Sequence, residues 1–240
     1  MSGPRRYWEI DCLRGLAVGL MLVSNFLFDL FFFAGRRQCE SAGLDWFARL
    51  VAGLFILVAG LSLTISRARG ADFPHFLGRG LKLIGLGLLI SLATWLVAGD
   101  QMVVFGVLHL IGLGTILAWP LLDHPWPSLG AGIAILLLTP FARRTLLVHP
   151  WFLWLGLRTP NFASVDYTPL IPWLGPLLLG IFLGRRLYPA GQRRWPLLGD
   201  APPGRLRLLA ASGRHSLLIY LSHQPLFLSA LFLARRWGWL

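Results

Sequence analysis

The chain is poor in charged residues, and the acidic ones are the scarcest. Of its 240 residues, 10 are Asp or Glu and 22 are Lys or Arg, and Lys82 is the one lysine. Its two cysteines, Cys12 and Cys39, stand at opposite ends of one long apolar segment, too far apart along it for a disulfide. Metal-ligand spacings, a Walker phosphate loop, an HExxH zinc helix and a GxSxG nucleophile elbow are all missing. The sequence therefore predicts no metal cofactor and none of these active-site types.

Long apolar runs stand where a soluble chain would carry charge. Hydrophobic residues make up 56% of the chain and charged residues 13%, so we predict an all-α, polytopic integral membrane helix bundle with about seven transmembrane helices. The predicted spans are residues 8–35, 46–66, 76–98, 102–122, 128–141, 169–184 and 208–234. The fifth run is short, a length that also suits a re-entrant or interfacial piece. No repeat or domain boundary is visible, so residues 1–240 form one predicted domain.

The arginines lie between the apolar runs and predict the sidedness of the chain. Residues 185–207 hold six arginines against Asp200, which places a Pro-, Gly- and Arg-rich linker, residues 187–207, in the cytoplasm. The basic N-terminus is predicted to be cytoplasmic as well, and the C-terminus to lie outside. A net charge of +12 arranged in this way suits the anionic headgroups of a lipid bilayer. We therefore do not expect nucleic acid as a partner.

The first apolar segment, residues 8–35, carries ionisable and amide side chains that are costly inside a bilayer and that indicate a functional site. Arg14 and Asn25 are eleven residues apart, about three helical turns, so they share one face. Asp11 lies one turn before Arg14, and Asp29 lies one turn after Asn25. A helix with such a polar stripe needs a protein interior or a wet cavity against it. The alternative for Asp11 and Arg14 is a packing pair at the membrane edge.

In the predicted topology, one layer of polar side chains lies toward the cytoplasm and is strongly basic. Guanidinium groups bind phosphate oxygens bidentately, so this layer suits the phosphates of a bound cofactor. The alternative is that each cation only meets lipid headgroups and marks the inner side of the membrane. The predicted cofactor-binding residues are Arg14, Arg79, Lys82, Arg214 and His215.

A second polar layer lies toward the outside and contains two histidines within apolar runs, His109 and His223. Burial favours the neutral imidazole, which accepts a proton from an incoming hydroxyl or amine. The alternative for either histidine is an interhelical hydrogen bond. The predicted catalytic residues are His109, Asn25, Asp29 and His223, and the predicted substrate-binding residues are Asp166, Tyr220 and Gln224.

Five phrases follow one another along the chain and cover most of it. They are RYWEIDCLRGLAVGLMLVSNFLFDL, GLDWFARLVAGLFILVAGLSLTIS, FGVLHLIGLG, DYTPLIPWLGPLLLGIFLG and GRHSLLIYLSHQPL. Together they resemble the heparan-α-glucosaminide N-acetyltransferase catalytic-domain family, which has bacterial and archaeal multipass members. The resemblance implies a transmembrane acyltransferase that takes acetyl-CoA from the cytoplasmic side and passes the acetyl group to a sugar-bearing acceptor reached from the other side. It also implies a prokaryotic plasma (inner) membrane, and it leaves room for a homodimer.

The resemblance also bears on the catalytic residues. The wider acyltransferase superfamily carries an arginine, ten residues and then a histidine on its first conserved helix, and the matching positions here are Arg14 and Asn25. The sugar N-acetyltransferase branch is similar in having an asparagine there. Without a histidine at that position, the sequence favours His109 as the base, helped by Asp29 or Asp166, with Asn25 donating to the thioester oxygen. Direct transfer and a covalent intermediate both stay open.

These observations predict a membrane-embedded acyltransferase that moves an acetyl or other acyl group from cytoplasmic acyl-CoA to a sugar amine or hydroxyl of an extracytoplasmic or lipid-linked glycan. The alternative is a transporter or flippase for a small or lipid-linked solute that uses the same polar cavity without chemistry. Many transporters show two related halves, and the absence of such halves in this sequence disfavours that alternative. A purely structural membrane subunit fits less well, since a scaffold has no use for two costly polar layers.

Overall fold

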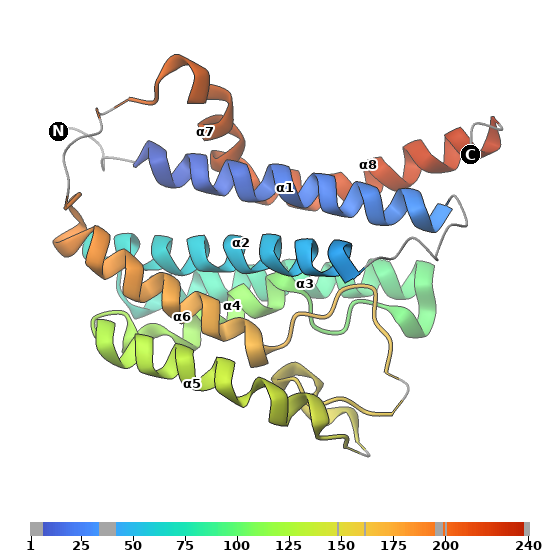
Figure 1. Ribbon diagram of the computed structural model, residues 1–240, viewed down its shortest axis with the longest axis horizontal. Coiled ribbons are helices and arrows are strands. Elements are labelled where there is room, and N and C mark those ends of the chain that lie inside the picture. Colours follow the sequence, from blue (N-terminus) through green and yellow to red (C-terminus); the bar gives the residue numbers. More distant parts are fainter. Residues whose placement is uncertain are drawn as a thin grey trace. The chain divides into compact units, whose positions relative to one another are not determined.

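The protein is all-helical over the part of the chain that its computed structural model describes, which confirms the predicted fold class (Figure 1). The described residues are 7–33, 42–147, 149–160, 162–194, 199 and 201–237. Cys39 and part of the predicted linker, residues 195–198 and 200, lie outside them. The helices are α1 (Trp8–Phe33), α2 (Ala42–Ala68), α3 (Phe73–Ala98), α4 (Val107–Leu117), α5 (Pro125–Arg144), α6 (Leu170–Leu187), α7 (Arg207–Arg214) and α8 (Ser216–Arg236).

Six of these helices are long and apolar enough to cross a membrane: α1, α2, α3, α5, α6 and α8. Helices suit a bilayer because they satisfy every backbone hydrogen bond within one segment. The described part of the chain also contains one shorter apolar helix, α4, of 11 residues. The chain is therefore an integral membrane protein, while the number of crossings and the side on which each terminus lies stay predictions.

Three of the predicted runs differ from the helices in the structure. The fourth run, residues 102–122, contains the short α4 followed by the helical turn Trp119–Leu121. Pro120 lacks the N–H that a continuing α-helix needs, which accounts for the end of α4. The fifth run is longer than predicted: α5 has 20 residues and begins at Pro125, a residue well suited to the first helical position. The last run is divided at His215 into α7 and α8.

The chain divides into two compact units, and the division falls within α2. Unit 1 comprises residues 1–55 and 197–240, and unit 2 comprises residues 56–196. The predicted single domain over residues 1–240 stays a prediction.

In unit 1, α1 packs against α7 and α8. Two glycines allow α1 and α7 to approach closely: a side chain at Gly15 would collide with the carbonyl oxygen of Leu209, and one at Gly213 with that of Asp11. Small residues at such crossings are typical of helix packing in membranes. Trp8 ties the start of α1 to the C-terminal segment, because its indole N–H donates to the carbonyl oxygen of Gly199 at 2.8 Å.

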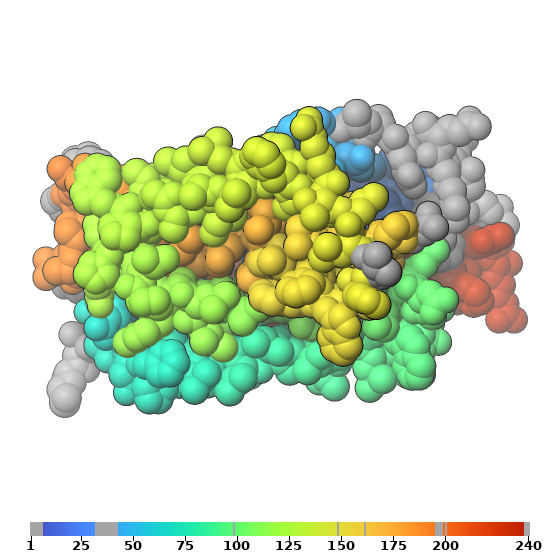
Figure 2. Space-filling view, turned by 90° about the horizontal axis from the view of Figure 1, so that it is seen from below, coloured from blue at the N-terminus to red at the C-terminus, as the bar shows by residue number. Residues whose placement is uncertain are grey.

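In unit 2, α5 packs along α6, α3 packs along α4, and α4 also contacts α6. Figure 2 looks onto the face where α5 and the segment after it lie over α6. Gly60 of α2 faces the backbone of α6 at Leu177, and Gly180 of α6 faces the backbone of α2 at Leu57. The core between these helices is apolar and includes Phe76, which is fully buried. This packed group of helices positions the polar residues of unit 2.

Candidate active site

The main polar contact of unit 1 joins residues 198 positions apart in the sequence. Asn25, in the middle of α1, lies with its amide nitrogen 2.8 Å from Nε2 of His223 on α8. His223 is buried, with 7% of its surface exposed. The structure thus brings together two of the four predicted catalytic residues.

Hydrogen-bond direction defines the chemical state of His223. Its Nδ1 lies 2.6 Å from the backbone carbonyl oxygen of Tyr220, and a carbonyl oxygen only accepts, so Nδ1 carries the proton. In the neutral ring, Nε2 then has the free lone pair and accepts from the Asn25 amide. The lone pair that would take up a proton therefore points toward α1.

Asp29 and Gln224 form a second contact between α1 and α8. The side-chain nitrogen of Gln224 lies 3.1 Å from both carboxylate oxygens of Asp29, and Asp29 is only 5% exposed. Buried carboxylates usually pair with a cation. The hydrogen-bonded partner that the structure records for Asp29 is this neutral amide, so the carboxylate charge remains available to a cationic ligand.

Aromatic rings surround His223. The ring of Phe227 lies 5.8 Å from that of His223 at 85°, and Phe26 packs edge-on against Phe227 at 5.4 Å. The Tyr220 ring lies 5.7 Å from that of His223 and stacks on Phe55 at 6.5 Å. These rings pack against the imidazole and hold its orientation.

The basic residues predicted for cofactor binding lie near helix ends or on exposed faces. In unit 1, Arg14 pairs with Asp11 at 3.0 Å, the pair that was given as the alternative for these two residues, and Arg214 and His215 are exposed at the junction of α7 and α8. In unit 2, Arg79 and Lys82 are exposed on α3.

His109 and Asp166 lie at the start of α4 in unit 2. The backbone N–H of Gly106 donates to Nδ1 of His109 at 3.3 Å, and the next N–H, that of Val107, donates to Asp166 at 3.3 Å. The second carboxylate oxygen of Asp166 accepts from the Thr168 hydroxyl at 2.9 Å. The two side chains thus satisfy consecutive backbone donors at the N-terminus of α4, where such groups have no helical partner.

Asp166 lies in the connection that leads to α6, outside the candidate spans. Desolvation raises the pKa of its carboxyl above the ordinary value, and the hydrogen bonds from Thr168 and Val107 act in the opposite direction. The same connection contains Tyr167, whose pKa is raised by burial and lowered in part by Arg158.

The structure therefore sorts the twelve predicted site residues into three sets. Five meet between α1 and α8 in unit 1: Asn25, Asp29, Tyr220, His223 and Gln224. Two meet at the start of α4 in unit 2: His109 and Asp166. The remaining five are the basic residues. In the described part of the chain, no group of three or more His, Cys, Asp or Glu residues could hold a metal ion.

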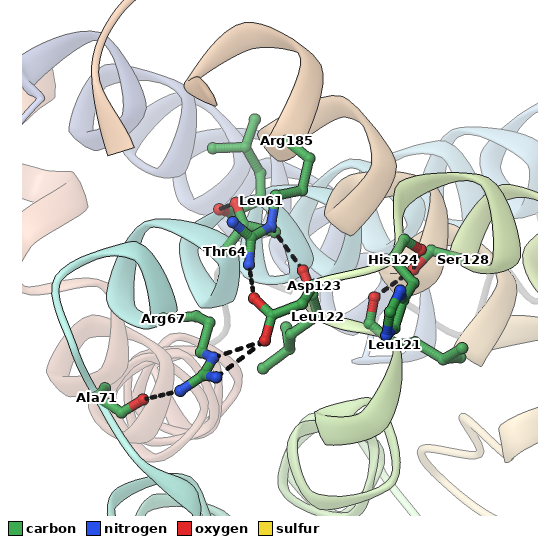
Figure 3. A network of polar contacts seen from close by, with 10 residues as sticks. All are labelled: Leu61, Thr64, Arg67, Ala71, Leu121, Leu122, Asp123, His124, Ser128 and Arg185. Atoms are coloured by element: carbon green, nitrogen blue, oxygen red, sulfur yellow. Dashed lines mark hydrogen bonds and ion pairs between the residues drawn. The ribbon is translucent and has the colours of Figure 1, made fainter. Parts of the chain in front are cut away.

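A charged cluster in unit 2 is missing from the predicted site residues (Figure 3). Asp123, after the short helical turn Trp119–Leu121, accepts from Nε of Arg67 at 2.9 Å and pairs with the guanidinium of Arg185. Arg185 also donates to the carbonyl oxygen of Leu122 at 2.6 Å, and Arg67 lies 4.6 Å over the ring of Trp119. One carboxylate thus joins the ends of α2 and α6 to the connection between α4 and α5. The signal was present in the sequence, as Asp123 stands among arginine-rich run ends on the predicted cytoplasmic side.

Comparison with known protein families identifies a family whose model covers most of the chain. Residues 6–225 match the family described as heparan-alpha-glucosaminide N-acetyltransferase, catalytic. The match extends from the start of α1 into α8 and so includes every one of the twelve predicted site residues. Neither a curated protein nor a solved structure matches the chain.

Proposed function

The chain belongs to the heparan-alpha-glucosaminide N-acetyltransferase catalytic family, and on that premise we propose that it transfers an acetyl group from acyl-CoA to the amino group of a sugar-containing acceptor. The family implies a membrane-embedded acetyltransferase. We add two proposals to what the family implies. The donor is acyl-CoA supplied from the cytoplasmic side, and the acceptor is an extracytoplasmic or lipid-linked glycan.

The observation that carries the proposal is the contact between Asn25 and His223. The Nε2 lone pair of His223 is the available proton acceptor, and the Tyr220 carbonyl holds the tautomer that presents it. A general base of this kind contributes about 10²–10⁴-fold to a rate. Both lone pairs accept an N–H in this structure: that of His223 from the side-chain amide of Asn25, and that of His109 from the backbone of Gly106. Because a side-chain amide can rotate away from the ring and a backbone N–H cannot, we assign the base role to His223.

The proposed reaction is a direct acyl transfer. The acceptor nitrogen attacks the thioester carbonyl carbon, and its proton moves to Nε2 of His223 as the C–N bond forms. The carbonyl oxygen gains negative charge and accepts a hydrogen bond from the Asn25 amide. The C–S bond then breaks, and His223 returns the proton to the departing sulfur, which yields the amide product and free CoA.

The acceptor is proposed to be an amine because of Asp29. Its buried carboxylate lies one turn beyond Asn25 on α1 and is held by Gln224, a neutral partner. A buried carboxylate attracts an ammonium group more strongly than a hydroxyl group, because less water screens the charge. The bound ammonium releases one proton to water before the reaction, and the resulting neutral amine is the nucleophile. Gln224 and Tyr220 are the proposed substrate-positioning residues beside it, and Asp166 stays a proposed substrate contact in unit 2.

The phosphates of CoA need cations. Arg214 and His215 are exposed at the end of α7, and Arg79 and Lys82 are exposed on α3, so each is accessible to an anion. Arg14 has a partly exposed guanidinium beside Asp11. We propose these five residues as contacts for the CoA phosphates. We also propose that the protein lies in a prokaryotic plasma membrane, and the proposal is compatible with a homodimer.

The test is turnover by the purified protein in lipid nanodiscs. With acetyl-CoA as donor, we expect acetylation of glucosamine to be faster than acetylation of glucose, which has a hydroxyl in place of the amine. Asp29→Asn should reduce this preference by roughly tenfold or more, since it removes one partner of a buried charge pair. Asp45→Asn is the matched control, because Asp45 is an exposed carboxylate on α2.

Two results would contradict the proposal. If CoA is never released by the wild-type protein with any sugar acceptor, the acyltransferase assignment fails. If a solute crosses the membrane without consumption of acetyl-CoA, the transporter alternative is favoured instead.

A further inference from the structure

The ring of His109 is enclosed between α3 and the segment that precedes α4. It is only 5% exposed, and the ring of Phe105 lies over it at 5.4 Å and 30°. On α3, Gly87 faces the ring so closely that a side chain there would come within 2.8 Å of its atoms. The position of the imidazole is therefore defined by packing on at least two sides.

The hydrogen bond at Nδ1 determines where the proton of His109 lies. The Gly106 N–H donates to Nδ1 at 3.3 Å, so Nδ1 must carry a lone pair. In a neutral imidazole the proton is then on Nε2. This is the reverse of His223, in which Nδ1 is the donor. Of the two buried histidines, His109 presents an N–H, and His223 presents a lone pair.

The Nε2 atom of His109 is buried and has no hydrogen-bond partner among the described residues. Leaving a buried donor unsatisfied costs about 1–3 kcal/mol, and most buried polar groups in native proteins have a partner. The Nε2–H of His109 is therefore available to donate a hydrogen bond to an oxygen atom of a ligand.

The surroundings restrict the charge of that ligand. Asp166 places its carboxylate on the adjacent N–H of Val107, and a side chain at Gly106 would approach the same carboxylate oxygen. An anionic ligand such as a phosphate would be repelled by this charge. The ring of Phe105 covers one face of the imidazole, so that side of the site is apolar. An uncharged carbonyl oxygen meets both conditions.

We propose that His109 is a hydrogen-bond donor that holds an uncharged carbonyl oxygen of the acyl-pantetheine arm through its Nε2–H. The proposal rests on the acyl-CoA-dependent function above. In this role His109 is a positioning residue for the donor substrate, while proton transfer belongs to His223.

Two substitutions separate a donor from a base. His109→Gln keeps an oxygen for the Gly106 N–H and an N–H group for the ligand, whereas His109→Leu keeps bulk and removes both. A donor role predicts that His109→Leu raises KM for acetyl-CoA by about tenfold, the equivalent of one hydrogen bond of roughly 1.4 kcal/mol. His109→Gln should stay within a few-fold of wild type, with an unchanged pH profile. His124→Leu, an exposed histidine before α5, is the matched control.

A second measurement does not depend on turnover. With ¹⁵N-labelled histidine, we expect the His109 signals to show a proton on Nε2 and none on Nδ1, and the Nε2 signal to move when a non-hydrolysable acetyl-CoA analogue is added. The signals are assigned by their loss in His109→Gln. A glucosamine addition alone should leave them in place, which separates the acyl donor from the sugar as the source of the oxygen.

Each contrary outcome has a distinct meaning. A His109→Gln protein that loses 10²-fold or more of kcat, together with one limb of the pH profile, would make His109 the base and overturn the proposal. An unchanged KM for acetyl-CoA in His109→Leu would overturn the proposal as well, and so would an Nε2 signal that does not shift when the analogue is added. An internal water would then be the partner of the Nε2–H. Lack of turnover by the wild-type protein would overturn the proposed function and this inference together.

Discussion

Asn25 and His223 should behave as one functional unit, and a double-mutant cycle measures this directly. The perturbations are Asn25→Ala, His223→Ala and the pair combined. Asn25→Ala removes the amide that lies 2.8 Å from Nε2 of His223 and that is proposed to donate to the thioester oxygen. His223→Ala removes the proposed proton acceptor, which is buried between Tyr220 and Phe227.

The magnitudes follow from these roles. Loss of one oxyanion donor lowers kcat by about 10²–10³-fold. Loss of a general base lowers it by about 10²–10⁴-fold. If the two residues acted independently, the double mutant would lose the product of the two factors. Because they touch, we expect a coupling free energy of about 1–3 kcal/mol, so the double mutant should lose roughly 5- to 150-fold less activity than that product.

The assay is release of free CoA from acetyl-CoA with a glucosamine acceptor, at saturating concentrations of both substrates. Ser222→Ala provides the control cycle with Asn25→Ala, because Ser222 is exposed on α8 and its hydroxyl donates to the carbonyl of Ile219 on the same helix. That control pair should be additive. Additive losses in the Asn25 and His223 cycle would refute the reasoning, as would a His223→Ala protein with wild-type kcat.

Three further predictions concern stability and are read from thermal unfolding in detergent. Asp123→Asn should lower the unfolding free energy by roughly 1 kcal/mol, since it removes the charge that two arginines share, and the loss should shrink at high salt. Gly180→Ala should cost about 1–3 kcal/mol by overpacking the crossing of α2 and α6, whereas Gly85→Ala, with open space around it, should be neutral or stabilising. The pKa of Asp166 is raised in the folded protein, so its contribution to the unfolding free energy should fall as the pH rises above 3.8, its ordinary value. Over that range the wild type should therefore lose stability relative to Asp166→Asn.

The contrary results for these variants are equally definite. A salt-independent loss in Asp123→Asn would mean that the cluster acts through packing rather than through charge. Equal unfolding temperatures for Gly180→Ala and Gly85→Ala would contradict the close helix crossing. Equal changes of stability with pH in the wild type and in Asp166→Asn would contradict a raised pKa at Asp166.

Much of the fold could be predicted from residue types and their order. Apolar runs of membrane length predict helices because a bilayer offers the backbone no other partner, and α1, α2, α3 and α6 begin and end within a few residues of the predicted runs. The contact between Asp11 and Arg14 followed from helical spacing alone. Five ordered phrases were enough to indicate the family, which the match over residues 6–225 confirms.

The partners of the polar residues were decided by tertiary structure. Sequence spacing places Asn25 and Asp29 on one helix, but only the packing of α8 against α1 pairs them with His223 and Gln224, about 195 residues further along the chain. Asp29 was expected beside a histidine base, and its hydrogen-bonded partner is the amide of Gln224.

Hydrogen-bond direction is the other property that sequence does not encode. His109 and His223 are the same residue type in similar apolar runs, yet one accepts a backbone N–H at Nδ1 and the other donates to a backbone carbonyl from the same atom. The residue pattern predicts which polar side chains a helix carries and on which face of the helix they lie. Which atom of an imidazole carries the proton depends on the single donor or acceptor that the folded backbone places against it, and that placement exists only once the helices have packed.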